Sequence, residues 1–246
     1  MSKPVSDAWW TTAFDASYAQ RYAHRDDDSA QAEIAGIVPR LLQQSGPVLD
    51  ACCGGGRHLQ SLRQQGVPAW GFDWSLPLLQ MAAEREHCAG SLLRADVRQL
   101  PFADGVCSAV LLLFTAFGYF DDADNQRTLD GLMRLLAPQG FLLIDLPDPQ
   151  VVRRTLVPSS QRSLADGSTL HEERWLQGAY VCKRSRWHSA QGWQTREERV
   201  RLYDAAEMAS LVAQSGGVIE SCWSSLRGPQ DDDQRRVYWI QASGSR

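Results

Sequence analysis

A glycine-rich turn between an apolar run and a helix-forming segment is the feature that most constrains the fold of this chain. Residues 47–51 form the apolar run, residues 54–56 are all glycine, and helix-forming residues continue to about Gln65. Glycine permits a left-handed backbone and lets a ligand approach bare peptide groups. A strand that enters such a turn and a helix that leaves it are typical of α/β proteins with a ligand at the start of the helix.

Short apolar runs alternate with amphipathic segments along the first 150 residues. Strands are predicted at residues 47–51, 69–73, 91–95, 106–114 and 141–146. Helices are predicted around residues 34–42, 57–65 and 124–136, and another begins near Pro77, where the missing N–H costs little. Continuous apolar strands alternating with helices predict a parallel sheet that is covered on both faces.

The pattern changes after residue 150. Residues 170–177, 180–189 and 193–203 read as strands with mixed faces, joined by hairpin-like turns. They predict an antiparallel insertion of three strands. A helix returns at residues 204–215 with Asp204 as its N-cap, and two last strands are predicted at residues 218–226 and 236–242.

These elements predict an α/β fold with a Rossmann-like seven-stranded mixed sheet, helices on both faces and an inserted antiparallel three-stranded lid. We expect the last strand to run antiparallel. The expected organisation is a single domain over residues 1–246. Within it, residues 1–30 form an N-terminal lid segment, residues 31–150 and 204–246 form the core, and residues 151–203 form a substrate lid.

Charge and composition exclude several classes of protein. The net charge of −4 argues against broad electrostatic binding of nucleic acid. The longest apolar run, residues 109–114, is far shorter than the roughly 20 residues that a membrane span needs. The N-terminus has no apolar signal region, so a cytoplasmic protein is expected. The six cysteines form no paired ligand motif, so we expect reduced thiols and no metal. No sequence feature indicates an oligomeric state.

The spacing of the glycines separates the possible ligands. A dinucleotide fingerprint needs glycine at its first, third and sixth positions. Whether the fingerprint is started at Cys52 or at Gly54, at least one of these positions is not glycine. A phosphate-binding loop needs a lysine that this segment lacks. What the loop does contain is an acidic residue followed by two alternate glycines, Asp50-x-x-x-Gly54-x-Gly56.

Two further acids stand at predicted strand ends. Asp73 ends the second strand, where a carboxylate is placed to accept both hydroxyls of a ribose, and Asp96 follows the third, where it can accept from an adenine amino group. The carboxyl ends of parallel strands form the natural ligand crevice of such a sheet. We therefore expect these acids and the glycine loop to share one site.

Four ordered motifs carry a family resemblance. Residues 52–58, 71–75, 95–102 and 135–140 together resemble a class I S-adenosylmethionine-dependent methyltransferase, and the resemblance extends from residue 14 to 242. Residues 22–26 and 201–203 resemble a branch of that family that acts on small molecules. Cys52 and Gln139 depart from the pattern, since glycine is common at both positions.

The resemblance implies S-adenosylmethionine as cofactor and implies roles for particular residues. The cofactor-binding set is Tyr22, Arg25, Asp50, Ala51, Cys52, Gly54, Gly56, Asp73, Trp74, Ala95, Asp96, Val97 and Phe114. The acceptor-binding candidates are Tyr18, Phe117, Tyr119, Arg184, Arg186 and Arg201. No catalytic residue is assigned, and His24 and Tyr22 are the candidates.

The expected reaction is methyl transfer from S-adenosylmethionine to a nitrogen or oxygen of a small-molecule acceptor. In-line displacement needs alignment and exclusion of water rather than a dedicated nucleophile. Methylation of a peptide, protein or nucleic acid, and a catalytically silent S-adenosylmethionine-binding protein, are the alternatives. A nucleotide-dependent oxidoreductase is disfavoured by the glycine spacing.

An aromatic stripe near the N-terminus is expected to close over the site. Phe14, Tyr18 and Tyr22 recur every four residues, which places them on one face of a helix. We expect residues 9–28 to act as a lid that orders over the bound cofactor and acceptor.

Overall fold

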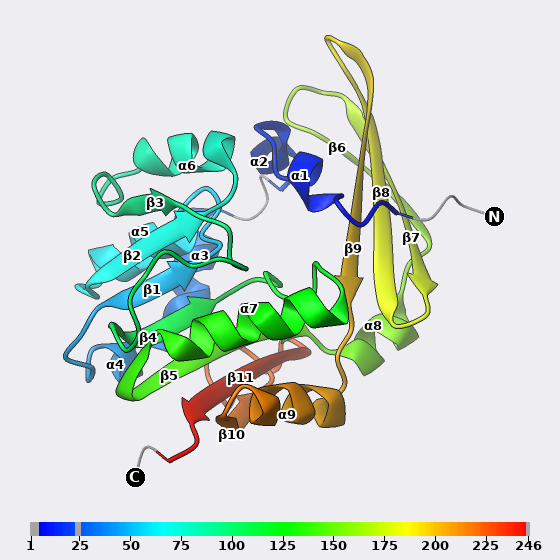
Figure 1. Ribbon diagram of the computed structural model, residues 1–246. Coiled ribbons are helices and arrows are strands. Elements are labelled where there is room, and N and C mark those ends of the chain that lie inside the picture. The colour runs from blue at the N-terminus through cyan, green and yellow to red at the C-terminus, as the bar shows by residue number, and fades with distance from the viewer. Residues whose placement is uncertain (1–4, 23–25, 245–246) are drawn as a thin grey trace.

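A seven-stranded mixed sheet forms the centre of the molecule. The computed structural model describes residues 5–22 and 26–244 (Figure 1). Its strands are β1 (Val48–Ala51), β2 (Ala69–Asp73), β3 (Leu92–Arg94), β4 (Cys107–Leu112), β5 (Leu136–Pro147), β10 (Gly217–Trp223) and β11 (Arg235–Ala242). They lie in the order β10-β11-β5-β4-β1-β2-β3. Strand β11, the last in the chain, is antiparallel to both its neighbours, as expected.

Helices cover both faces of this sheet. They are α3 (Asp27–Ile34), α4 (Val38–Leu41), α5 (Arg57–Gln64), α6 (Leu76–Ala83), α7 (Asp122–Arg134) and α9 (Ala205–Gln214). Figure 1 shows α7 and α9 in front of the sheet and α4 and α5 behind it. Alternate residues of β5 enter two different cores: Leu142 and Ile144 pack with the α7 side, and Phe141 and Leu143 with the α5 side. The predicted doubly covered sheet is confirmed.

The antiparallel insertion contains four strands rather than three. Strands β7 (Thr169–Gln177), β8 (Tyr180–Ser189) and β9 (Gly192–Arg201) match the predicted segments, and β6 (Ser159–Ser163) adds an edge beside β7. Strand β6 reads Ser-Ser-Gln-Arg-Ser and is mostly exposed, so no apolar alternation marked it in the sequence. Helix α8 (Pro149–Thr155), which connects β5 to this sheet, was also not predicted.

The N-terminal segment forms two short helices instead of one continuous helix. Helix α1 (Trp10–Ala13) ends at Phe14, and α2 (Ser17–Arg21) begins after a turn in which Asp15 accepts from the N–H and hydroxyl of Ser17. The helix expected over residues 34–42 is likewise divided between α3 and α4. Among the described residues, no helix is long and apolar enough to cross a membrane.

Ion pairs attach the N-terminal segment to the inserted sheet. Asp7 lies 2.7 Å from an Arg199 nitrogen, and Asp15 accepts from Arg196 Nε at 2.9 Å. Figure 1 shows α1 and α2 between α6 and this sheet. The two segments are therefore held together although about 180 residues separate them in the chain.

Gly118 joins the inserted sheet to the loop that follows β4. Its carbonyl accepts from the Arg201 N–H at 2.8 Å, and its φ of +91° is left-handed. A Cβ at this position would lie 2.8 Å from the Arg201 carbonyl oxygen. Gly167 has a similar φ of +83° but open space around it.

We expect Gly118→Ala to lower the free energy of unfolding more than Gly167→Ala does. Left-handed strain costs about 1–2 kcal/mol at either position. At Gly118 the close backbone contact should add about 1 kcal/mol or more, the lower end of overpacking costs. Urea unfolding of the two variants measures the difference. Equal losses would contradict the close approach at Gly118.

Candidate functional site

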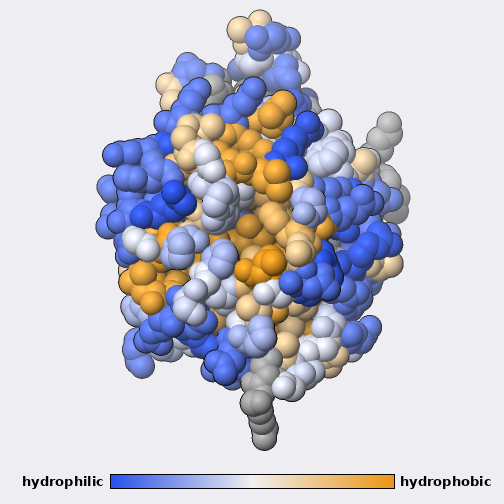
Figure 2. Space-filling view, turned by 60° about the vertical axis from the view of Figure 1, so that its left-hand side comes forward, coloured by the Kyte–Doolittle hydropathy of each residue, from blue (hydrophilic) through white to orange (hydrophobic). Residues whose placement is uncertain are grey.

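A cavity of about 940 Å³ opens at the carboxyl ends of β1, β2, β3 and β4. Figure 2 shows hydrophobic residues gathered in a hollow in the middle of the face that includes α6, with hydrophilic residues around it. The volume lies near the upper end of the range for ligand pockets, roughly 300–1,000 Å³. Residues from the N-terminal segment complete the lining.

Most of the residues predicted for the site line this cavity. They are Tyr18, Tyr22, Asp50, Cys52, Gly54, Asp73, Trp74, Ala95, Asp96, Val97, Phe114 and Tyr119. The lining does not include Ala51, Gly56, Phe117, Arg184, Arg186 or Arg201. His24 and Arg25 lie outside the described residues.

Left-handed residues shape the loop between β1 and α5. Cys52 and Gly54 have φ values of 57° and 54°, and Gly56, the residue before α5, has a φ of 76°. A Cβ on Gly56 would come within 2.9 Å of the Ala82 Cβ, so this glycine allows α6 to pack closely. Gly56 therefore serves packing, while Gly54 and Gly55 line the cavity.

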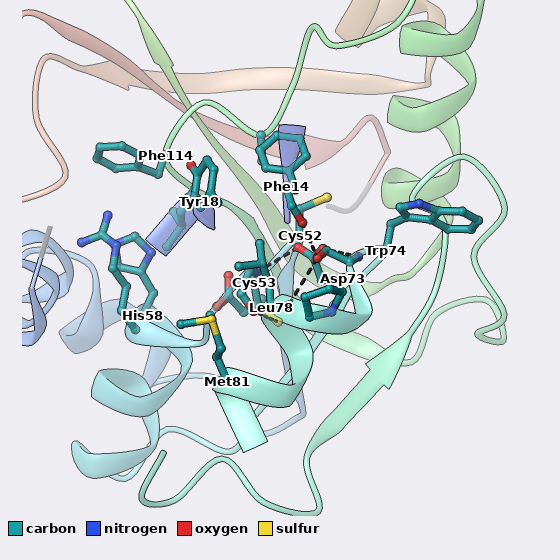
Figure 3. A pocket seen from close by; sticks show the side chains of 18 of the residues that line it. Phe14, Tyr18, Cys52, Cys53, His58, Asp73, Trp74, Leu78, Met81 and Phe114 are labelled. Atoms are coloured by element: carbon teal, nitrogen blue, oxygen red, sulfur yellow. Dashed lines mark hydrogen bonds between the residues drawn. The ribbon is translucent and has the colours of Figure 1, made fainter. Parts of the chain in front are cut away.

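The Asp73 carboxylate ties two loops together. Oδ2 accepts from the N–H of Gly54 at 2.9 Å, and Oδ1 accepts from the N–H of Ser75 at 2.7 Å (Figure 3). Burial raises the pKa of Asp73, and these backbone N–H groups offset part of that rise. The carboxylate is thus fixed at the end of β2 and faces the cavity.

Asp50 is a buried carboxyl group with an unused oxygen. The residue is 2% exposed, and no described residue forms a hydrogen bond with its Oδ2. Burial raises the pKa of Asp50 to about 7, although the charge of Arg57 acts to lower it. A buried polar oxygen without a partner is costly, so this atom is suited to accept from a bound ligand.

Asp96 is paired with Arg98 rather than exposed in a free turn. Arg98 Nε and Nη2 donate to its two oxygens at 3.0 and 2.7 Å. Burial acts to raise the pKa of Asp96, but the hydrogen bonds and charge of Arg98 hold it below its ordinary value. The Arg98 guanidinium lies over the rings of Trp10 and Phe120, at 4.7 and 4.6 Å from their centroids.

An aromatic wall, formed by Phe14, Tyr18, Tyr22 and Tyr119, borders the cavity. Ring centroids are 5.2 Å apart for Phe14 and Tyr18, 4.5 Å for Tyr18 and Tyr22, and 5.5 Å for Phe14 and Tyr119. The expected stripe is therefore continuous although the helix is broken. Figure 3 shows Phe14 and Tyr18 on the side of the cavity opposite Leu78 and Met81. The Ser75 hydroxyl fixes this wall by donating to the Phe14 carbonyl at 2.6 Å.

A strained turn places Phe114 at the cavity. Phe114 and Thr115 are both left-handed, with φ values of 59° and 67°. The fully buried Asp145 accepts from the Phe114 N–H at 2.9 Å and forms an ion pair with Arg235, which also donates to the Thr115 hydroxyl at 3.1 Å. Left-handed non-glycine residues persist only where their surroundings hold them, and here a buried ion pair does so.

Sequence reasoning missed several residues of the lining. Trp10 lies four residues before Phe14, so the same periodicity could have found it. Leu78 and Met81 belong to α6, directly after Asp73, and Arg57 follows the glycine loop. The Arg57 guanidinium lies 4.7 Å from the Phe114 ring centroid and 2.8 Å from Glu33.

The predicted acceptor residues outside the cavity have structural partners. Arg184 pairs with Glu197 at 2.6 Å, and Arg201 pairs with Glu207 at 2.6 Å. Phe117 is buried, with its ring centroid 5.6 Å from that of Tyr203. Arg186 is exposed and lies 5.8 Å from the Trp193 ring centroid. Arg184 thus pairs within the inserted sheet and Arg201 with α9, and both lie away from the cavity. No group of three or more metal-binding side chains occurs among the described residues.

Comparison with known proteins finds methyltransferases among the similar sequences and structures. Residues 48–140 match the family model of a methyltransferase domain. The chain is 34% identical over 108 residues to the demethylmenaquinone methyltransferase of Thermus thermophilus, covering 42% of this chain and 48% of that protein. It is 27% identical over 178 residues to the malonyl-[acyl-carrier protein] O-methyltransferase of Salmonella typhimurium, covering 72% and 64%. The match thus spans about half of the first relative and under two thirds of the second.

The solved structure of a sugar N-methyltransferase from Streptoalloteichus has the same fold, with a TM-score of 0.74 and 21% identity over 99% of this chain and 98% of that one. The sheet and its cavity define an α/β protein with a ligand-sized cavity at the carboxyl ends of its strands. The chain thus matches a methyltransferase domain over residues 48–140 and shares the fold of solved S-adenosylmethionine-dependent methyltransferases.

The residues at the cavity fit S-adenosylmethionine. The unpartnered Asp50 oxygen matches an ammonium group, and the fixed Asp73 and Asp96 carboxylates match hydroxyl and amino donors. A Cβ built on Gly55 would meet nothing within 4 Å, so the loop leaves room for a ligand.

We expect the pKa of Asp50 to make the stability of the ligand-free protein depend on pH. Its folded pKa of about 7 lies above the ordinary value for an aspartate, 3.8, so the folded state binds more protons than the unfolded state between these pH values. The contribution of this group to the free energy of unfolding therefore falls as pH rises from about 4 to 7, by about 1.4 kcal/mol per pH unit. Asp50→Asn should show a stability advantage that grows across this range and is constant above it.

Chemical unfolding at a series of pH values checks this expectation. Asp231→Asn, in an exposed loop, is the control and should keep the wild-type pH dependence. A constant difference between Asp50→Asn and wild type from pH 4 to 8 would show that Asp50 is ionised throughout.

Proposed function

We propose that the protein transfers a methyl group from S-adenosylmethionine to a nitrogen or oxygen of a small molecule. The observation that carries the proposal is one cavity in which the glycine loop and three carboxylates face an aromatic wall. When bound, the cofactor supplies an electrophilic methyl group on a sulfonium. The cavity volume of about 940 Å³ leaves space for an acceptor beside the cofactor.

The residues of the cavity have distinct proposed roles. Asp73 accepts the ribose hydroxyls, Asp96 accepts the adenine amino group, and Asp50 accepts an ammonium group. The rings of the aromatic wall attract a positively charged sulfonium. The wall also excludes water and helps to align the acceptor with the methyl group.

The named relatives support a small-molecule or carrier-bound acceptor. Those relatives act on demethylmenaquinone, a malonyl-acyl-carrier protein and a sugar, according to their names. A peptide, protein or nucleic-acid acceptor is the second candidate within this proposal, and the net charge of −4 weighs against nucleic acid. A cytoplasmic location remains part of the proposal. Detectable turnover of S-adenosylmethionine in the presence of a metabolite library would exclude a catalytically silent binding protein.

We expect Asp73→Ala to weaken binding of S-adenosylhomocysteine by roughly 1.5–3 kcal/mol, because charge-assisted hydrogen bonds to the ribose are lost. Asp96→Asn should cost about 1 kcal/mol, since an amide oxygen still accepts one hydrogen bond. Calorimetric titration of the folded variants measures both. Asp73→Asn, which keeps the side-chain volume, separates loss of charge from collapse of the loop.

Unchanged affinity in folded Asp73→Ala would contradict the proposed ribose site. A larger loss for Asp96→Asn than for Asp73→Ala would reverse the placement of ribose and adenine. No detectable binding by the wild type would refute the proposed function.

We also propose that residues 9–28 close over the occupied site. In the structure this segment is docked, with Trp9 4% exposed and Ala13 fully buried. Hydrogen exchange of residues 9–22 should be slower with S-adenosylhomocysteine than without it, because the ligand completes the surface on which the aromatic wall packs. The amides of β4 serve as the internal reference. Equal protection in both states would mean that the segment is permanently docked.

A further inference from the structure

Eight aromatic rings line the cavity, and six of them already lie against a cation of the protein. The eight are Trp10, Phe14, Tyr18, Tyr22, Trp74, Phe114, Tyr119 and Phe120. A guanidinium or ammonium group lies 4.6–5.8 Å from the ring centroids of Trp10, Tyr18, Tyr22, Trp74, Phe114 and Phe120. A fixed cation already interacts with the negative face of its ring, and it repels a second positive charge that approaches the same ring. These six rings are therefore poor contacts for a cationic group of a ligand.

Two rings of the aromatic wall are occupied in this way. Arg21 lies 5.8 Å from the Tyr18 ring centroid. Lys183 Nζ lies 4.6 Å from the Tyr22 ring centroid and also contacts the Tyr22 hydroxyl. Carboxylates at 3.9 and 2.9 Å hold the two cations in place. The aromatic wall is therefore not uniform, because only part of it is open to a positive charge in the cavity.

Phe14 and Tyr119 form the open part of the wall. No Arg or Lys in the part of the chain that the structure describes lies over either ring. Their neighbour outside the lining is the neutral ring of Trp9, whose centroid is 5.7 Å from that of Phe14 and 5.0 Å from that of Tyr119. Trp9 is 4% exposed, and its Nε1 donates to the Tyr119 carbonyl at 3.3 Å. The two rings are thus fixed without a cation beside them.

The proposed cofactor contacts locate the sulfur atom of the donor near Cys52. Asp73 is assigned to the ribose and Asp50 to the ammonium group, and in S-adenosylmethionine the sulfur links the ribose to the amino-acid chain. Cys52 lies in the loop between Asp50 and Gly54, whose N–H donates to Asp73. A sulfur held between these two carboxylates therefore lies beside this loop.

The two open rings stand at the same place. Hydrogen bonds of Ser75 connect Phe14 to Asp73. Figure 3 shows these side chains near Cys52. Burial raises the pKa of the Tyr119 phenol well above its ordinary value, and Cys52 and Asp73 are among the nearby groups that raise it further. Tyr119 is thus a neutral ring close to the position expected for the sulfur.

From these observations we propose that Phe14 and Tyr119 distinguish the charged sulfonium donor from its neutral thioether product, and that Tyr18 and Tyr22 do not. This inference rests on the proposed methyl transfer. When the methyl group passes to the acceptor, the electron pair of the S–C bond stays on sulfur and the positive charge is lost. The two rings therefore favour the bound donor over the bound product.

Dissociation constants of S-adenosylmethionine and S-adenosylhomocysteine, measured by calorimetry without an acceptor, test the proposal. Phe14→Leu keeps an apolar side chain but removes the ring, so it should weaken binding of S-adenosylmethionine about fivefold more than binding of S-adenosylhomocysteine. Tyr18→Leu is the matched comparison, because it removes the next ring of the same wall, which Arg21 already occupies. It should change the two affinities by the same factor, within twofold.

Two further variants separate ring charge from ring shape. Pentafluorophenylalanine in place of Phe14 keeps the packing of the ring and reverses the charge of its face, so it should reduce the preference for S-adenosylmethionine at least as much as Phe14→Leu. Tyr119→Phe keeps the ring face and should keep the preference. Equal losses for both ligands in the two Phe14 variants, or an equally selective loss in Tyr18→Leu, would overturn the proposal and leave methyl transfer standing. Failure of the wild type to bind either ligand would instead overturn the proposed function.

Discussion

One carboxylate connects the parts of the molecule that surround the cavity. Asp73 accepts from Gly54 in the glycine loop and from Ser75 at the start of α6. Ser75 in turn caps α6 by accepting from the Leu78 N–H and donates to the carbonyl of Phe14 in the N-terminal segment. The end of β2 thereby sets the positions of the loop, the helix and the aromatic wall together, because each depends on a hydrogen bond within this short chain of contacts.

Unlike charges help to hold the N-terminal segment, which carries most of the aromatic wall, against the inserted sheet. Residues 149–201 contain ten Arg or Lys and five Asp or Glu in a chain whose net charge is negative. Several of these basic residues face acidic partners in other segments, as Arg199 and Arg196 face Asp7 and Asp15. Pairs of this kind are individually weak when exposed but gain strength in networks. These ion pairs act together with an apolar cluster in which Trp9 and Ala13 pack with Cys182 of the inserted sheet.

The sequence was sufficient to predict the helices and strands whose local residue pattern agrees with the environment that they have in the fold. Apolar runs located β1, β2 and β4, and strand-end acids located the cavity, because parallel strands bring their carboxyl ends together. Elements shaped by distant partners were less predictable. Strand β6 forms on a polar sequence because β7 offers an edge, and α1 and α2 are separate because the Asp15 turn intervenes. The contacts of Arg184 and Arg201 depend on partners in β9 and α9 that the spacing of the arginines does not reveal.

The Phe114–Thr115 turn is held by residues of the central sheet, so it does not depend on the outer segments for its shape. Asp145 and Arg235 hold this turn from β5 and β11, within the central sheet. Residues from the N-terminal segment complete the cavity, and ion pairs hold this segment to the inserted sheet, whose described residues lie outside the lining. Substitutions in the N-terminal segment can alter the shape and charge of the cavity directly, while the braced turn and the Asp73 contacts persist. Selection can then vary this wall while the part of the cavity at the strand ends keeps its form.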